Sequence, residues 1–256
     1  MDWALIAGGS KGIGLSIAEA LAVRKWNLFL VARNEKDLAS TKSRIENTYG
    51  VQVEILPCDL SFQNSSEIIH DWCIKKNVAI KLLCNAAGLG GSKDFPDLQP
   101  DEAETMIRLN FESAVALIYR FIPMLKKNTP SYILNVASMA GFAPFPIKSI
   151  YSATKAALIS FSYSLKNILR TERISVSCLC PGPVFTKPAI EQETVRQLGV
   201  FGRQMAVDPA KVGEEAVRQM LNGKLIIIPG KLAGISTFLL RILPRRLMAR
   251  ILYRSR

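Results

Sequence analysis

The regular alternation of short apolar runs with longer helical patterns is the feature that most restricts how this chain can fold. The runs are rich in Val, Ile, Leu, Ala and Cys, as in strands buried on both faces. The predicted strands are residues 3–7, 27–31, 51–56, 79–84, 131–137, 174–180 and 224–228. The predicted helices are residues 12–24, 35–48, 64–76, 101–127, 150–170 and 209–222. This order predicts an α/β fold: a single doubly wound domain over residues 1–230, with a seven-stranded parallel sheet flanked by helices.

A glycine-rich turn directly joins the first predicted strand to the first predicted helix. Its glycines allow a tight turn and the close approach of a pyrophosphate, while the following helix N-terminus supplies amide donors. The spacing G-x-x-x-G-x-G differs from the usual dinucleotide fingerprint, but the strand–turn–helix context is the one that this fingerprint requires. The turn therefore predicts a nucleotide site that includes Gly8, Ser10, Lys11, Gly12, Ile13 and Gly14.

Arg33, at the end of the second predicted strand, indicates which nucleotide this is. An NAD enzyme is expected to carry Asp or Glu there, to accept a hydrogen bond from the ribose 2′-hydroxyl. Arg33 and Lys11 instead suit the 2′-phosphate, so NADP(H) is expected to be preferred over NAD. The alternative is that Arg33 merely begins the polar helix that follows it.

Small and polar residues also follow the later strands, at the edge of the sheet where a doubly wound fold binds its ligands. Asp59 suits an adenine amino group, or equally the N-cap of the next helix. The small residues at 85–88 allow a flat ligand to approach closely, and Thr186 could bond a carboxamide. The expected nucleotide site therefore also includes Asp59, Leu60, Asn85, Ala86, Ala87, Pro181, Gly182, Val184 and Thr186.

Tyr151 and Lys155 are four residues apart at the start of a predicted helix, so they lie on one helix face about one turn apart. A phenol with a pKa near ~10 is a poor proton donor or acceptor at neutral pH. A neighbouring ammonium favours the phenolate and lowers that pKa. The same spacing also occurs on ordinary amphipathic helices. Ser138, at the end of the fifth predicted strand, and Asn110, inside a predicted helix where Asn is mildly unfavourable, are the other candidates.

Together these residues resemble the short-chain dehydrogenase/reductase family over about residues 3–230. Two positions depart from its pattern, because Ala7 stands where many members have Thr and Ala86 replaces the second Asn of N-N-A-G. The resemblance implies a Rossmann domain that binds NADP(H). The motifs that carry it are Gly8-x-x-x-Gly12-x-Gly14, Asp59, Asn85-Ala86-Ala87-Gly88, Asn110, Ser138, Tyr151-x-x-x-Lys155 and Pro181-Gly182.

The resemblance also implies a role for each catalytic candidate. Tyr151 would be the general acid in carbonyl reduction, and Lys155 would lower its pKa and bind the nicotinamide ribose. Ser138 would donate a hydrogen bond to the substrate oxygen. Asn110 would hold a water that links Lys155 to solvent. Tyr151 and Lys155 thus count as cofactor-binding residues as well as catalytic ones.

The implied activity is NADPH-dependent hydride transfer between the nicotinamide and a carbonyl or secondary alcohol. Residues 184–207 occupy the position of the family's substrate-binding segment, and the apolar Phe142, Phe145 and Pro146 would add to the pocket wall. This composition suits a hydrophobic small-molecule substrate. Two alternatives remain: a 3-oxoacyl-thioester reductase of lipid metabolism, or a non-catalytic, membrane-associated nucleotide-binding protein.

The net charge of +12 is concentrated in a C-terminal extension, residues 231–256. Because the body is less basic, a nucleic-acid partner is not expected. The apolar run of the extension is too short to span a membrane, and after Pro244 it reads as a basic amphipathic helix. It suits peripheral contact with an anionic membrane, or packing on its own domain or on another subunit of a homo-oligomer. Its basic residues are Lys231, Arg241, Arg245, Arg246, Arg250, Arg254 and Arg256.

The histidine and cysteine content limits the remaining possibilities. His70 is the only histidine, which excludes a Ser-His-Asp hydrolase and any histidine-based metal site, so no metal is expected. The five cysteines contain no C-x-x-C pair and are expected to be reduced thiols. A strand that begins at residue 3 leaves no room for a signal peptide. We therefore expect a cytoplasmic protein, either free or at the inner face of a membrane.

Overall fold

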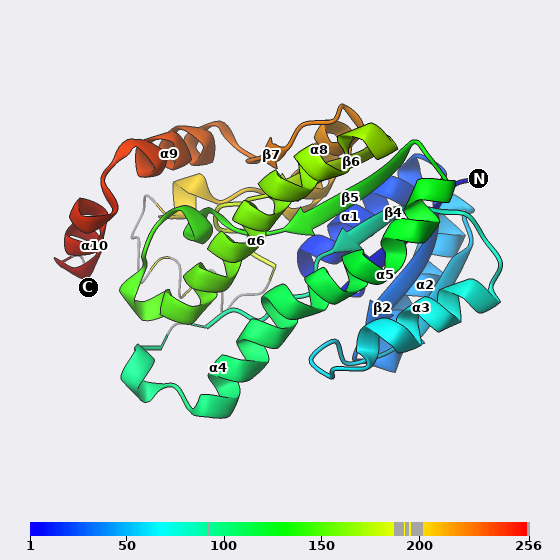
Figure 1. Ribbon diagram of the computed structural model, residues 1–256, viewed down its shortest axis with the longest axis horizontal. Helices are drawn as coiled ribbons and strands as arrows, with labels where there is room; N and C mark the ends of the chain where they lie inside the picture. The colour runs from blue at the N-terminus through cyan, green and yellow to red at the C-terminus, as the bar shows by residue number, and fades with distance from the viewer. Residues whose placement is uncertain (92, 187–191, 193–194, 196–201, 255–256) are drawn as a thin grey trace.

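The computed structural model describes residues 1–91, 93–186, 192, 195 and 202–254. Their centre is a seven-stranded parallel sheet with the strand order β3-β2-β1-β4-β5-β6-β7 (Figure 1). This confirms the predicted fold class. The strands are β1 (Trp3–Ala7), β2 (Asn27–Ala32), β3 (Val53–Pro57), β4 (Ile80–Asn85), β5 (Ser131–Val136), β6 (Ile174–Leu179) and β7 (Ile226–Ile227).

The helices follow the predicted order, and the C-terminal extension contains the helix expected after Pro244 and one more before it. The α-helices are α1 (Gly12–Val23), α2 (Glu35–Tyr49), α3 (Ser65–Lys75), α4 (Pro100–Ile107), α5 (Ser113–Lys127), α6 (Ser149–Ile168), α8 (Pro209–Leu221), α9 (Lys231–Ile242) and α10 (Arg245–Arg254). The short helices are η1 (Phe95–Asp97), η2 (Arg108–Glu112), η3 (Met139–Phe142), η4 (Pro146–Lys148) and η5 (Arg170–Glu172).

Helices cover both faces of the sheet. Successive strand residues point to opposite faces, and both sets are apolar. In β1, Ala4 and Ile6 pack into a buried cluster with α1, α2 and α8. Trp3 and Leu5 point the other way, into a cluster with α3, α5 and α6. A strand buried on both faces needs a helix layer on each. The result is the three-layer arrangement that the continuous apolar runs predict.

One predicted helix is interrupted. Residues 101–127 were expected to form a single helix, but the chain forms α4, the π-helical segment η2 and then α5. A π-helical turn contains an extra residue, which rotates the following side chains and is frequent at functional sites. Asn110 lies in this segment and is buried. The interruption therefore coincides with the residue that an ordinary helix would disfavour.

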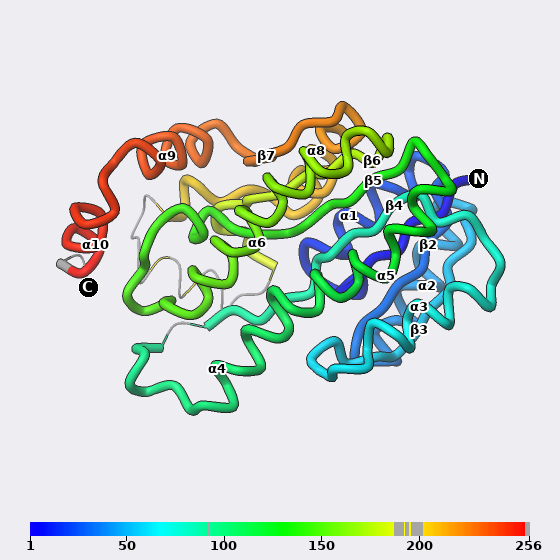
Figure 2. The backbone as a smooth tube through the Cα atoms, viewed as in Figure 1, coloured from blue at the N-terminus to red at the C-terminus, as the bar shows by residue number. Residues whose placement is uncertain are grey.

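The order of the strands locates the ligand-binding edge. β1 lies between β2 and β4, so the crossover direction reverses there, and a crevice forms outside the carboxyl ends of these two strands. The backbone closes this point directly, because Ala86 N donates to Ala7 O at 2.8 Å. Figure 2 shows the N-terminus at one end of the molecule and α10 at the other.

Candidate active site

The glycine turn after β1 packs against the turn after β4. Gly8 has a positive φ of 91°, and a Cβ on it would lie 2.6 Å from Ala87 N. No side chain fits there, so the requirement for glycine comes from both conformation and close backbone approach. Ala86 and Ala87 pack on opposite faces of the sheet, each against one of the two apolar clusters. These residues meet at the crevice between β1 and β4, as predicted.

The turn after β6 reaches the same crevice. Its position is fixed by Met139 N, which donates to Pro181 O at 3.0 Å, and by Thr186 N, which donates to Val184 O at 2.9 Å. Thr186 Cγ2 lies 3.5 Å from the point where a Cβ on Gly12 would be. A glycine turn at a helix N-terminus and a facing hydroxyl form a cradle that fits a dinucleotide. The structure therefore brings the predicted residues of both turns together.

Some predicted cofactor residues contribute by packing. Ile13 packs on the cluster beneath α1, and Leu60 is buried in the cluster on the other face. Ser10 O accepts a hydrogen bond from Thr41 Oγ1 at 3.3 Å, which ties the glycine turn to α2. Gly182 lies against Met139, whose sulfur would be 3.1 Å from a Cβ at this position.

The two cations expected to recognise a 2′-phosphate each have an acidic neighbour. Lys11 Nζ lies 2.6 Å from Asp37 Oδ2, and Arg33 Nη1 lies 4.0 Å from Asp59 Oδ2. Both cationic side chains are largely exposed, at 61% and 68%. Asp37 was not singled out from the sequence. Its place in the first turn of α2, after the N-cap Asn34, is the signal that could have identified it.

Asp59 also stabilises its own turn. Its Oδ1 accepts hydrogen bonds from Ser61 N at 2.9 Å and from Ser61 Oγ at 2.8 Å. The N-cap position of α3 belongs to Asn64, so the capping role considered for Asp59 is not observed. The carboxylate instead lies between its own turn and Arg33.

Asn85 begins a buried polar chain that links the sheet to α6. Its Nδ2 donates to Asn135 Oδ1 at 2.9 Å, and Asn135 Nδ2 donates to Ser162 Oγ at 3.0 Å. Among the described residues, Asn85 Oδ1 is buried without a hydrogen-bond partner. These hydrogen bonds fix the ends of β4 and β5 relative to the helix that carries Tyr151 and Lys155.

The side chain of Ser138 lies close enough to Tyr151 to affect its pKa. Ser138 caps η3, and its Oγ accepts from Ala140 N at 3.1 Å. Burial raises the pKa of Tyr151 above its usual value, while the Ser138 side chain acts in the opposite direction. This rise is opposite to the lowering expected from the sequence, because desolvation of the phenolate is the largest contribution. Tyr151 therefore keeps its proton at physiological pH in this structure, as a weaker acid than a free phenol.

Lys155 is buried one helical turn further along α6. Its Nζ donates to Val136 O at 2.9 Å and lies 5.8 Å from the centroid of the Tyr151 ring. Burial lowers the pKa of Lys155 to about 8, and the nearby thiols of Cys178 and Cys180 act in the opposite direction. The predicted pairing of Tyr151 with Lys155 on one helix face is observed, while the surface alternative is not.

Gly141 allows the turn after β5 to lie directly on α6. A Cβ at this position would be 2.8 Å from the carbonyl carbon of Lys155 and 2.9 Å from Ala156 N. The contact is therefore backbone against backbone. It fixes the distance between η3, which begins after Ser138, and the first turns of α6. The small residues that follow Ser138 were the available signal for this contact.

Asn110 holds the loop after β4 in place. Its Oδ1 accepts from Leu89 N at 2.7 Å, and its Nδ2 donates to Leu89 O at 3.0 Å. The same Nδ2 donates to Thr154 Oγ1 at 3.2 Å, and Thr154 Oγ1 donates to Tyr151 O at 2.8 Å. Asn110 therefore connects the loop to α6, a role that sequence reasoning missed together with Leu89 and Thr154. Its implied water-holding role remains a prediction.

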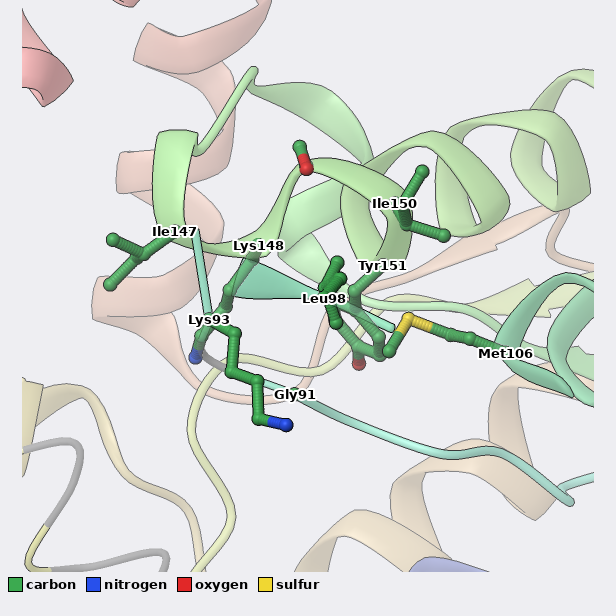
Figure 3. A pocket seen from close by; sticks show the side chains of 9 residues that line it. Gly91, Lys93, Leu98, Met106, Ile147, Lys148, Ile150 and Tyr151 are labelled. Carbon is green, nitrogen blue, oxygen red and sulfur yellow. The ribbon is translucent and has the colours of Figure 1, made fainter. Parts of the chain in front are cut away.

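A small pocket opens beside Tyr151 (Figure 3). In Figure 3 the phenol of Tyr151 lies beside the side chains of Leu98 and Met106. The lining is mainly apolar, with lysines at the edge. It consists of Gly91, Lys93, Leu98, Met106, Ile147, Lys148, Ser149, Ile150 and Tyr151.

The pocket wall differs from the predicted one. Phe142, Phe145 and Pro146 are not part of the lining, and the Phe142 ring instead contacts the Arg241 guanidinium, 5.7 Å from its centroid. Met205 and Arg203 of the expected substrate-binding segment are described, and Met205 is buried. Residues 187–191, 193, 194 and 196–201 of that segment lie outside the described residues.

A tyrosine beside a buried lysine, at a sheet edge that also carries a nucleotide-type glycine turn, is typical of an α/β oxidoreductase of the nicotinamide-dependent class. Comparison with known proteins identifies the family. The family model described as short chain dehydrogenase matches residues 2–197. The chain belongs to the short-chain dehydrogenase/reductase family and is an oxidoreductase that acts on carbonyl or alcohol groups.

The chain is similar to several family members. The oxidoreductase DltE of Bacillus subtilis is 32% identical over 223 residues, which cover 86% of this chain and 82% of that protein. The very-long-chain 3-oxoacyl-CoA reductase of Laccaria bicolor is 32% identical, over 69% of this chain and 53% of that protein. The structure of a short-chain dehydrogenase from Sphingobium yanoikuyae in complex with NADPH has a TM-score of 0.78 and 26% identity, covering 96% of this chain and 97% of that one.

Proposed function

We propose that this protein is an NADPH-dependent reductase of hydrophobic carbonyl compounds, able in reverse to oxidise the corresponding secondary alcohols. The observation that carries the proposal is the position of Tyr151, which lines a mainly apolar pocket and lies beside the buried ammonium of Lys155 on the same helix. A carbonyl reductase needs a proton donor beside the substrate oxygen. A protonated phenol can fill this role because the alkoxide that develops during hydride transfer is a much stronger base than the carbonyl oxygen.

Each polar side chain of the site has a defined task in this proposal. Ser138 Oγ accepts from Ala140 N, so its hydroxyl proton can be donated to the substrate oxygen. Tyr151 donates its proton to the same oxygen as negative charge develops there. The Lys155 ammonium, 5.8 Å from the Tyr151 ring, stabilises the phenolate that remains. When bound between the glycine turn and the turn after β6, the nicotinamide cofactor supplies the hydride.

The preference for NADPH rests on the corner formed by Lys11 and Arg33. Both cations are exposed at the end of the crevice, where the adenosine ribose of a dinucleotide lies in this fold. Asp37 and Asp59 neutralise them in part, and a 2′-phosphate would compete for the same cations. The similarity to a family member in complex with NADPH also supports the preference.

A 3-oxoacyl thioester is the second candidate substrate. It is favoured by the similarity to reductases named for very-long-chain 3-oxoacyl-CoA. The side chains of Leu98, Met106, Ile147 and Ile150 give the small pocket beside Tyr151 an apolar lining, which would contact the reacting end of such a substrate rather than its whole acyl chain. From the sequence, we also propose that the protein is cytoplasmic and homo-oligomeric and that it has no nucleic-acid partner.

A screen of NADPH oxidation tests the proposed function. Hydrophobic ketones, aldehydes and 3-oxoacyl thioesters of increasing chain length are the substrates. With any substrate that turns over, Tyr151→Phe is expected to lower kcat on the order of 100-fold or more, because it removes the general acid. NADPH binding, measured by fluorescence titration, should change little.

Tyr119→Phe is the matched control, because it makes the same chemical change at an exposed site on α5. It is expected to retain the wild-type rate. A Tyr151→Phe protein that keeps most of its rate would refute the assignment of the general acid. Tight NADPH binding without turnover of any substrate would favour the non-catalytic alternative.

A further inference from the structure

Helices α9 and α10 form a C-terminal arm, residues 231–254, whose outer surface has no use in the proposed chemistry. Figure 1 shows the arm in red at one end of the molecule, beside the beginning of α6. α9 packs against η3, and α10 packs against η4. The arm therefore rests on the segment between Ser138 and Tyr151. None of the described helices meets the length and apolarity that crossing a bilayer would require.

The inner face of the arm is well packed. Ala233 and Thr237 of α9 are fully buried, and Met248 of α10 is almost fully buried. One turn beyond Thr237, the Arg241 guanidinium contacts the Phe142 ring and donates through Nη2 to Tyr163 Oη at 3.2 Å. The arm is thus held on the domain by a regular inner stripe, which fixes the orientation of its outer surface.

The outer face carries large apolar side chains that remain in solvent. In α9, Ile235, Phe238 and Ile242 are 61%, 63% and 63% exposed, at the spacing of one helix face. Exposed apolar residues continue into α10. A contiguous patch of this kind is typical of an interaction surface. The members of this outer stripe are Ile235, Phe238, Leu239, Ile242, Leu243, Leu247 and Ile251.

The charge around the outer stripe is of one sign. The extension contains seven basic residues and no acidic residue. Within the described part of the chain, no carboxylate forms an ion pair with the arm's side chains at positions 231, 241, 245, 246 or 250. The arm therefore presents apolar side chains among basic groups without acidic partners inside the chain.

We propose that the arm binds the surface of an anionic lipid bilayer, with the outer stripe in the interface and the basic residues at the lipid headgroups. An amphipathic helix of this kind lies in the plane of the interface, with its apolar face among the upper acyl chains. Anionic headgroups supply the negative charge that the extension itself lacks.

A second copy of this chain fits the surface less well. A two-fold dimer through the arm would bring the same patch of both subunits together. The like charges of Arg245, Arg246 and Arg250 would then lie near those of the other copy, and the extension contains no acidic residue to separate them. Charge complementarity therefore favours the bilayer over self-association. Membrane binding does not depend on turnover. Either proposal can therefore fail while the other one holds.

Flotation of the full-length protein with lipid vesicles tests the proposal. Phosphatidylcholine vesicles with and without phosphatidylglycerol are the probes. The stripe variant combines Ile235→Ser, Phe238→Ser and Ile242→Ser, and the charge variant combines Arg245→Gln, Arg246→Gln and Arg250→Gln. Each variant has a matched control on exposed residues outside the arm. The apolar control combines Val23→Ser, Tyr119→Ser and Ile168→Ser, and the charge control combines Lys36→Gln, Lys127→Gln and Lys211→Gln.

The wild-type protein should bind anionic vesicles and bind neutral ones far more weakly, with an affinity that falls as salt rises. The charge variant should bind on the order of 100-fold more weakly. The stripe variant should lose roughly 10-fold or more, and both controls should bind like the wild type. Phe238→Trp adds a direct readout, because its fluorescence should shift to the blue on anionic vesicles.

Three results would overturn the proposal. The first is that the wild-type protein does not bind anionic vesicles. The second is that the stripe variant, with a wild-type circular dichroism spectrum and Tm, binds as well as the wild type. The third is a dimeric wild type in light scattering that the stripe variant converts to a monomer, since this would assign the outer stripe to a second copy.

Discussion

Lys155 shows how burial shapes the site at the scale of a single residue. Its side chain is 4% exposed, and its ammonium donates to a backbone carbonyl rather than to a carboxylate. Removing a charge from water without an anionic partner is unfavourable, so the pKa of Lys155 falls from 10.5 to about 8. Lys155, for which we propose a role in catalysis, therefore destabilises the fold as long as it is charged.

This shift predicts a pH dependence of stability. Between pH 8 and 10.5 the unfolded chain holds a proton on Lys155 that the folded chain has released, so this residue makes stability rise with pH. The contribution is about 3 kcal/mol across the window. Urea unfolding of wild type and Lys155→Met on either side of the window measures it, and Lys127→Met, at an exposed site, is the control. Equal pH slopes for wild type and Lys155→Met would contradict the prediction.

The cofactor corner gives a second prediction for individual residues. Asp37 lies 2.6 Å from Lys11 and neutralises a cation that a 2′-phosphate needs. Asp37→Asn is therefore expected to raise the ratio of kcat/KM for NADPH to that for NADH about 5-fold, whereas Arg33→Gln should lower it about 10-fold. Steady-state kinetics with both cofactors measure the ratio, and Asp101→Asn on α4 is a neutral control. A wild-type preference for NADH would invalidate the NADPH assignment.

At the scale of elements, the site depends on how closely the turn after β5 approaches α6. Gly141→Ala would place a Cβ against backbone atoms of Lys155 and Ala156, which cannot rotate away. The turn must then move, and Ser138 moves with it. We expect kcat to fall on the order of 100-fold and Tm to fall as well. Kinetics and thermal unfolding check both effects.

Gly234→Ala is the control for this prediction, because a Cβ at that position of α9 meets no atom within 4 Å. This change should leave kcat unaltered and slightly raise stability, since alanine is a better helix former than glycine. If Gly141→Ala keeps the wild-type kcat and Tm, the close backbone contact does not position Ser138.

The elements also show which parts of the structure can be read from the sequence. Strand positions follow from apolar runs, and the glycine turn, Ser138 and the Tyr151–Lys155 pair follow from local spacing. The π-helical turn at Asn110 has no periodic signal of its own, because it arises from hydrogen bonds to Leu89 and Thr154, which are distant in sequence. The ion pair of Lys11 with Asp37 and the pocket wall from η1, α4 and η4 are tertiary in the same way.

At the scale of the whole molecule, the proposed reductase activity and the proposed membrane binding lie in different parts of the chain. The doubly wound body would supply the cofactor crevice and the proton donor, while the arm supplies half of the net charge of the chain. Composition located that charge correctly, but it left open whether the extension packs or remains free. In the structure the two faces of the extension differ. The inner stripe packs on the domain, and the outer stripe is exposed.

The contact between α10 and η4 has a consequence for how the protein would meet its substrate. Ile147 and Lys148 of η4 line the pocket, so a surface that holds the arm also lies near the pocket. An apolar substrate dissolved in that surface would be encountered by lateral diffusion in two dimensions. The rate would then follow the mole fraction of substrate among the lipids rather than its concentration in the volume. Adding inert lipid at constant total substrate would slow the reaction.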